Sequence, residues 1–222
     1  MDIVNRAVRF SFLTAGPMFE LQLPIDFGPL PWLSSPLRNG IGGRSFDFVP
    51  TTIDQGLQDG SVLIDVLEGR DGRFVELYER PDPPLTRWLR WQLSNGAIYT
   101  HIREVDELRM ASVTATSLSI VEDPAGGPPV IMPEAPLRVG ASTRPGYQEI
   151  ASFLSPSRGD GWTVVLQRPS FVPLGSQMIA SGDPVAIRAG SSFGIEVQVL
   201  AGMDRAAGET ITSALLASLA EV

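Results

Sequence analysis

Residues 87–104 read RWLRWQLSNGAIYTHIRE, and they give the clearest indication of how the chain folds. Apolar and polar residues alternate on both sides of Asn95-Gly96, a dipeptide typical of two-residue β-hairpin turns. The alternation predicts two antiparallel strands, at 87–93 and 98–104, with one buried face and one polar face.

A turn at Asn95-Gly96 also predicts which residues lie opposite one another. On the core face it gives three cross-strand pairs: Leu93 with Ile98, Trp91 with Thr100, and Leu89 with Ile102. On the other face it pairs Gln92 with Tyr99, Arg90 with His101, and Trp88 with Arg103. We call these six residues the arginine–aromatic stripe: Trp88, Arg90, Gln92, Tyr99, His101 and Arg103.

The stripe is the candidate binding site of the sequence. Arginine and aromatic side chains are enriched at protein interfaces. Arg90 and Arg103 can also grip a carboxylate or phosphate while Trp88 or Tyr99 stacks beside it. A solvated sheet face, or a face buried under a proline-rich segment, explains the same pattern without any binding.

The composition excludes several chemistries. All 17 basic residues are arginines, there is no cysteine, and His101 is the one histidine. Lysine Schiff bases, Walker phosphate loops, thiol nucleophiles and thiolate metal sites are therefore excluded. We expect no catalytic residue, no metal ligand and no cofactor. The competing hypothesis is a hydrolase that uses His101 or a carboxylate-bound divalent metal, although Arg90 opposite His101 would disfavour an imidazolium there.

Charge and hydropathy narrow the partners and the location. The net charge of −8 argues against nucleic acid, whose binding requires a basic surface. No apolar stretch is long enough to span a membrane and no signal peptide is seen, so we expect a cytoplasmic protein or part of a phage or injection particle. Arginine without lysine, with abundant alanine, glycine and proline, is typical of a high-GC bacterium or its phage.

The whole chain reads as α+β, dominated by antiparallel sheet. Two amphipathic helices are expected at about 106–119 and 205–220, after Asp106 and Asp204, and a short third helix at 147–153. Further strands are expected at 8–13, 18–23, 61–67, 73–79, 162–167, 184–188 and 193–200. The repeated order of strand, aspartate and helix suggests two related halves.

Prolines and glycines predict the domain organisation. We expect an N-terminal half at 1–122 containing an irregular, apolar, proline-rich arm at about 14–45. A Pro/Gly-rich linker follows at 123–147, and then a C-terminal half at 148–222. One compact domain is the alternative.

We expect a non-catalytic protein-binding adaptor or assembly component. Its partner would be another protein or its own copies, and a homo-oligomer could form through the apolar arm. Carboxylates at Asp65, Glu68, Asp71, Glu76 and Glu79 surround one predicted hairpin, and we interpret them as a solvated, charge-protected sheet edge. Besides the hydrolase, a small anionic-ligand binding or regulatory domain remains open.

Overall fold

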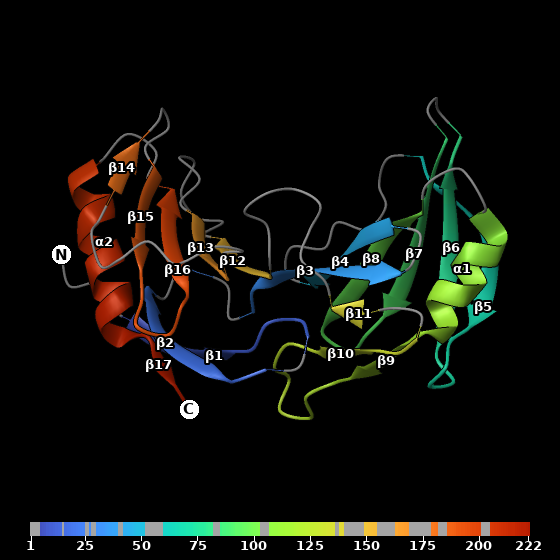
Figure 1. The fold of residues 1–222 in the computed structure, drawn as a ribbon, viewed down its shortest axis with the longest axis horizontal. Helices are drawn as coiled ribbons and strands as arrows, with labels where there is room; N and C mark the ends of the chain where they lie inside the picture. Colours follow the sequence, from blue (N-terminus) through green and yellow to red (C-terminus); the bar gives the residue numbers. More distant parts are fainter. Residues whose placement is uncertain are drawn as a thin grey trace. The chain divides into compact units, whose positions relative to one another are not determined.

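The computed structural model confirms an α+β chain built mainly of antiparallel sheet, with two helices in its described part (Figure 1). The structure describes residues 5–14, 16–24, 27, 30–39, 42–51, 60–81, 85–102, 107–135, 138–139, 149–154, 163–168, 179–181, 186–200 and 205–222.

The chain forms two compact units that are interleaved in the sequence. Unit 1 contains Met1–Phe12, Gly16–Leu33 and Arg144–Val222, and unit 2 contains Leu13–Ala15 and Ser34–Thr143. The passage from Thr143 back to unit 1 falls inside the predicted linker at 123–147, while residues 16–33 group with the C-terminal part of the chain.

Unit 2 holds the predicted hairpin. Its main sheet has the order β3 (Trp32–Asn39), β4 (Gly42–Pro50), β8 (Gly96–Ile102), β7 (Thr86–Gln92), β6 (Phe74–Arg80) and β5 (Val62–Glu68), with β11 (Arg138–Val139) on β3. A separate ladder joins β9 (Leu118–Val121) to β10 (Val130–Pro133), and helix α1 (Glu107–Thr116) contacts β5, β8 and β9. The core face carries large apolar side chains that are almost fully buried: Phe46, Phe48, Val75, Leu77, Leu89, Trp91 and Ile98.

Unit 1 combines two sheets with helix α2 (Arg205–Ser218). One sheet has the order β14 (Ile179–Ser181), β15 (Ala186–Gly190), β16 (Glu196–Leu200), β13 (Thr163–Gln167) and β12 (Ile150–Leu154); the other has β1 (Asn5–Phe10), β2 (Phe19–Pro24) and β17 (Ala220–Glu221). Helix α2 contacts β2, β15 and β16. The Phe10 ring lies within 6 Å of Phe12, Phe19 and Phe153, so aromatic packing connects β1 and β2 to β12.

Two local expectations are wrong. The short helix expected at 147–153 is strand β12 where it is described, because β13 pairs with it over its whole length. The irregular arm expected after the strand at 18–23 runs into strand β3, with Pro36 inside it, whereas the strand expected at 18–23 is present as β2. Asp106 and Asp204, the expected helix caps, lie outside the described residues.

Candidate functional site

The arginine–aromatic stripe lies on β7 and β8, but in a different register from the predicted one. Arg90 lies opposite Tyr99 and Trp88 opposite His101, while on the core face Trp91 lies opposite Ile98 and Leu89 opposite Thr100. The Leu93 backbone N donates to the Gly96 carbonyl (2.9 Å), so Ser94-Asn95 forms the tip of the turn. The predicted pairings are therefore wrong by two residues, whereas the assignment of residues to faces is right because a shift of two preserves it.

Gly96 explains why the predicted register of this hairpin is wrong. A side chain at this position would meet the Val49 carbonyl oxygen and would lie 2.6 Å from the Phe48 ring. The glycine is thus needed for close packing of β8 against β4, and it is not a residue with positive φ at the turn. The Asn95-Gly96 dipeptide carried the sequence signature of a turn one residue away from the real one.

Arg90 is the centre of the stripe, and its charge is already neutralised. Its Nη1 donates to Glu76 Oε2 on β6 (2.7 Å) and its Nε to Tyr99 Oη (3.2 Å), and a third bond reaches the Gln92 side chain. Burial would lower the pKa of Arg90, but the hydrogen bonds that it donates to Glu76 and Tyr99 raise it above its usual range. An anionic ligand would have to displace Glu76 to reach this guanidinium.

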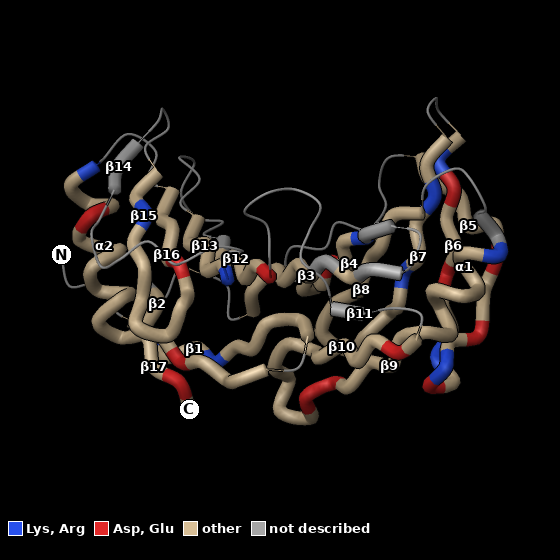
Figure 2. The backbone as a smooth tube through the Cα atoms, in the orientation of Figure 1, with Lys and Arg blue, Asp and Glu red and all other residues tan. Residues whose placement is uncertain are grey.

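The remaining stripe residues divide into a stacked pair and one position that is not described. The Trp88 and His101 rings lie 4.7 Å apart between centroids, tilted by 56°. His101 therefore faces Trp88 rather than Arg90, which removes the predicted repulsion between Arg90 and an imidazolium. Arg103 lies outside the described residues. The structure brings the five others together on one face of β7 and β8. These two strands are neighbours in the sheet of unit 2 (Figure 2).

A polar cluster that the sequence reasoning missed extends this face onto β3 and β4. Asp47 lies opposite Tyr99, and its Oδ1 accepts a bond from Ser45 (3.3 Å), whose hydroxyl is 2.9 Å from that of Ser34. Burial raises the pKa of Asp47, and the bonds from Ser34 and Ser45 oppose that shift. The alternation of Ser45 and Asp47 with Phe46 and Phe48 was the available signal.

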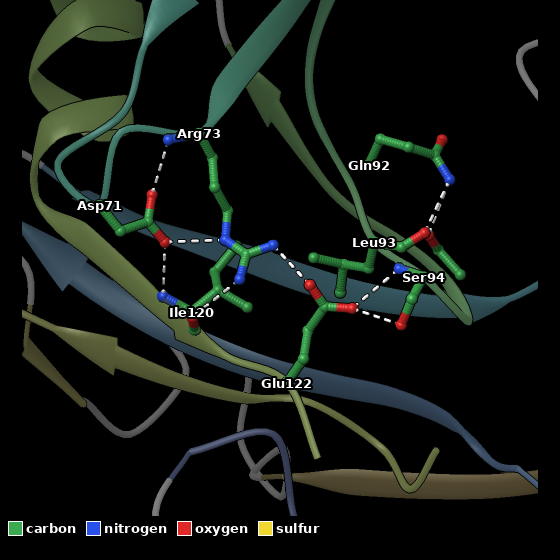
Figure 3. Close-up of polar contacts among 8 residues, drawn as sticks. Asp71, Arg73, Gln92, Leu93, Ser94, Ile120 and Glu122 are labelled. Carbon is green, nitrogen blue, oxygen red and sulfur yellow. Dashed lines mark hydrogen bonds and ion pairs between the residues drawn. The ribbon is translucent and has the colours of Figure 1, made fainter. Parts of the chain in front are cut away.

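A second polar cluster holds the β5–β6 and β7–β8 turns in place (Figure 3). Arg73 donates to Asp71 (3.0 Å) and to Glu122 (2.5 Å). Glu122 also accepts bonds from the Ser94 backbone N (2.8 Å) and hydroxyl (2.6 Å). Asp71 accepts one from the backbone N of Ile120 (3.2 Å). These bonds hold the β5–β6 turn, the β7–β8 turn and β9 together, so their role is structural.

Most of the exposed large apolar side chains described in unit 2 lie elsewhere, on β5 and at the start of β6. This strand ends the order of the sheet and, within the described part of the chain, pairs with β6 alone. Four apolar side chains on it are 42% to 57% exposed, and Phe74 on β6, opposite Glu68, is 74% exposed. We call this surface the β5 edge and define it by these residues: Val62, Leu63, Ile64, Asp65, Val66, Glu68 and Phe74.

The sequence interpretation recognised the charges of this edge but not its apolar character. A β-bulge between Leu63 and Asp65 interrupts the ladder near the start of β5. Bulges and charges are the usual protection of an edge strand. Five large apolar side chains are exposed on β5 and at the start of β6, which is more than such protection needs, and large exposed apolar patches are typical of interaction sites.

Across the described ranges, no group of three or more histidine or carboxylate side chains is arranged to hold a metal ion. None of the helices described is long and apolar enough to cross a membrane. No protein-family model, curated protein or solved structure matches this chain.

Proposed function

We propose that this protein is a non-catalytic adaptor or assembly component that binds another protein through the β5 edge of unit 2. The observation that carries the proposal is the exposed apolar row on β5 and β6 at the open side of the sheet. Burying such a row contributes roughly 25 cal/mol for each Å² of apolar area removed from water.

The arginine–aromatic stripe supports this site rather than forming it. Glu76 lies opposite Arg90 on one side and opposite Val66 of the β5 edge on the other. The ion pair between Arg90 and Glu76 therefore braces the strand directly behind the edge. A braced strand loses little conformational freedom on binding, which favours affinity.

The alternatives have weaker support. A small anionic ligand at Arg90 would compete with Glu76 and Tyr99 for the same donors. A hydrolase through His101 would have to act from a ring that is stacked on Trp88. Origin in a high-GC bacterium or its phage, and assembly into a particle, remain predictions from composition.

Site-specific crosslinking tests the proposal. A photoreactive amino acid would replace Val66 in one variant and Val121 in another, each made in the source cells. Val121 is the matched control, because it is a valine on a unit 2 strand with nearly the same exposed fraction, 50% against 48%. We expect one discrete adduct from position 66, identified by mass spectrometry, and a much weaker one from position 121.

The identified partner would then be purified and its affinity measured. Val66→Ser should weaken binding about tenfold or more, and Val121→Ser by less than twofold, because only the first removes interfacial apolar area. No adduct at position 66, or equal adducts at both positions, would overturn the proposal. An adduct of twice the chain mass would identify a second copy as the partner.

A further inference from the structure

We infer that the β5 edge binds an extended strand of its partner, and that this strand carries two basic residues three positions apart. The inference rests on the proposed function and deepens it by naming the chemistry of the partner. Two features of β5 support it: the backbone it presents and the charges it leaves unneutralised.

The backbone of β5 is suited to accept a further strand. An edge strand presents N–H and C=O groups on its open side, and extended peptides bind by continuing the ladder. The Val66 amide donates to the carboxylate of its neighbour Asp65 (2.8 Å). This local bond occupies one amide of β5 with a side chain. A carbonyl of an added strand can take the place of that carboxylate.

The charges around the edge make this exchange favourable only for a basic strand. Four arginines of unit 2 already have carboxylate partners: Arg70 with Glu134, Arg73 with Glu122, Arg87 with Glu79, and Arg90 with Glu76. Asp65 and Glu68 are exposed, and among the described residues neither has an arginine partner. The edge therefore presents unneutralised negative charge beside apolar side chains.

The positions of Asp65 and Glu68 set the pattern of the added strand. They are three residues apart, so their side chains lie on opposite faces of the sheet with Val66 and Leu67 between them. Residues directly opposite in a ladder interact most strongly. An added strand in either direction would thus place basic, apolar, apolar and basic residues opposite these four.

A second copy of the chain fits the edge less well. Two β5 strands would bring the same carboxylates together, and each chain carries a net charge of −8. Like charges on neighbouring strands destabilise a sheet, so charge complementarity favours a different, basic segment.

Short labelled peptides test this chemistry directly. The probe reads Thr-Arg-Val-Val-Arg-Val-Thr, its acidic twin has glutamate for arginine, and a spacing control of identical composition reads Thr-Val-Arg-Arg-Val-Val-Thr. Binding to the full chain would be followed by fluorescence anisotropy, and protection of the Val66 amide by hydrogen exchange. We expect the probe to bind about tenfold tighter than its twin, since two exposed ion pairs each contribute up to about 1 kcal/mol.

The expected dependence on the protein is equally specific. Asp65→Asn with Glu68→Gln should reduce the preference for the probe over its twin to about twofold or less, while the same change at Glu134, which pairs with Arg70, should leave it intact. The Val66 amide should become protected when the probe binds. Equal affinity for probe and twin, equal affinity for probe and spacing control, or no protection at Val66 would overturn the inference.

This outcome is separable from that of the proposed function. If a partner crosslinks at position 66 but the probe and its acidic twin bind equally well, the proposed binding surface stands and the basic strand is ruled out. Failure of crosslinking at position 66 removes the proposed function whatever the peptides do.

Discussion

The arginine–aromatic stripe on β7 and β8 and the β5 edge belong to the same sheet, but their charged side chains differ. The charge on the stripe is paired with a carboxylate, whereas the carboxylates on the edge have no arginine partner among the described residues. On the stripe, Arg90 has bonds to Glu76, Tyr99 and Gln92 and is half-buried. On the edge, Asp65 and Glu68 are exposed beside exposed apolar side chains. A residue type that is enriched at interfaces therefore does not by itself mark a binding surface; what marks it is whether the side chain still lacks a partner.

The largest expected effect is on the packing beneath the stripe. Gly96→Val should lower the free energy of unfolding by about 3 kcal/mol, because the new side chain meets the Val49 carbonyl and the Phe48 ring. Val66→Thr, on the edge, should change it by less than about 0.5 kcal/mol. Urea unfolding followed by tryptophan fluorescence measures both. Equal losses would mean that the edge is as tightly packed as the hairpin.

The second largest expected effect is on the stability contributed by the polar cluster around Glu122, which holds the β5–β6 and β7–β8 turns in place. Burial would raise the pKa of Glu122, but bonds from Ser94 and Arg73 lower it below its ordinary value. A carboxylate with a lowered folded pKa contributes stability above its unfolded pKa and loses it as the pH falls through the folded value. Glu122→Gln should therefore cost about 1 kcal/mol at pH 7.

The pH dependence distinguishes this role from simple loss of a side chain. The difference in stability between the wild type and Glu122→Gln should begin to shrink as the pH falls below about 4.5, where the unfolded carboxylate binds protons, and should vanish once the pH lies below the lowered folded pKa and both side chains are neutral. Glu68→Gln, which removes an exposed carboxylate on the β5 edge, provides the control. A constant difference for Glu122→Gln would show that its charge contributes nothing.

The smallest effect separates the ion pair of the stripe from its surroundings. A double-mutant cycle of Arg90→Met and Glu76→Gln should give a coupling energy of about 0.5 to 1 kcal/mol, as expected for a partly exposed pair with good geometry. The same cycle on Arg9 and Glu20, an exposed pair in unit 1, should give less. A coupling near zero at Arg90 would mean that the stripe does not brace β6.

The alternation of apolar and polar residues was sufficient to predict on which face of the hairpin each residue lies, but not the register between its two strands. The period of two follows from the strand itself, so Trp91 and Leu89 were correctly assigned to the core. The register depends on residues far away in the sequence: Phe48 and Val49 require a glycine at 96, and Glu122 holds Ser94. No local pattern contains that information.

The other differences have the same cause. Residues 150–154 are compatible with helix or strand, and pairing with β13 selects the strand. Pro36 was expected to interrupt regular structure, yet it lies within β3. The β5 edge was missed as a candidate surface because exposure of Val66 and Ile64 depends on the position of β5 at the end of the sheet, which the sequence does not reveal.

The interleaving of the two units has a consequence for synthesis on the ribosome. The backbone N of Gln22 on β2 bonds to Ser218 at the end of α2, 196 positions later, and β2 also pairs with β17. Domains fold as they emerge, and contacts between distant positions form late. We therefore expect unit 2 to fold while unit 1 is still incomplete, leaving the phenylalanine-rich first strands exposed until the last helix is translated.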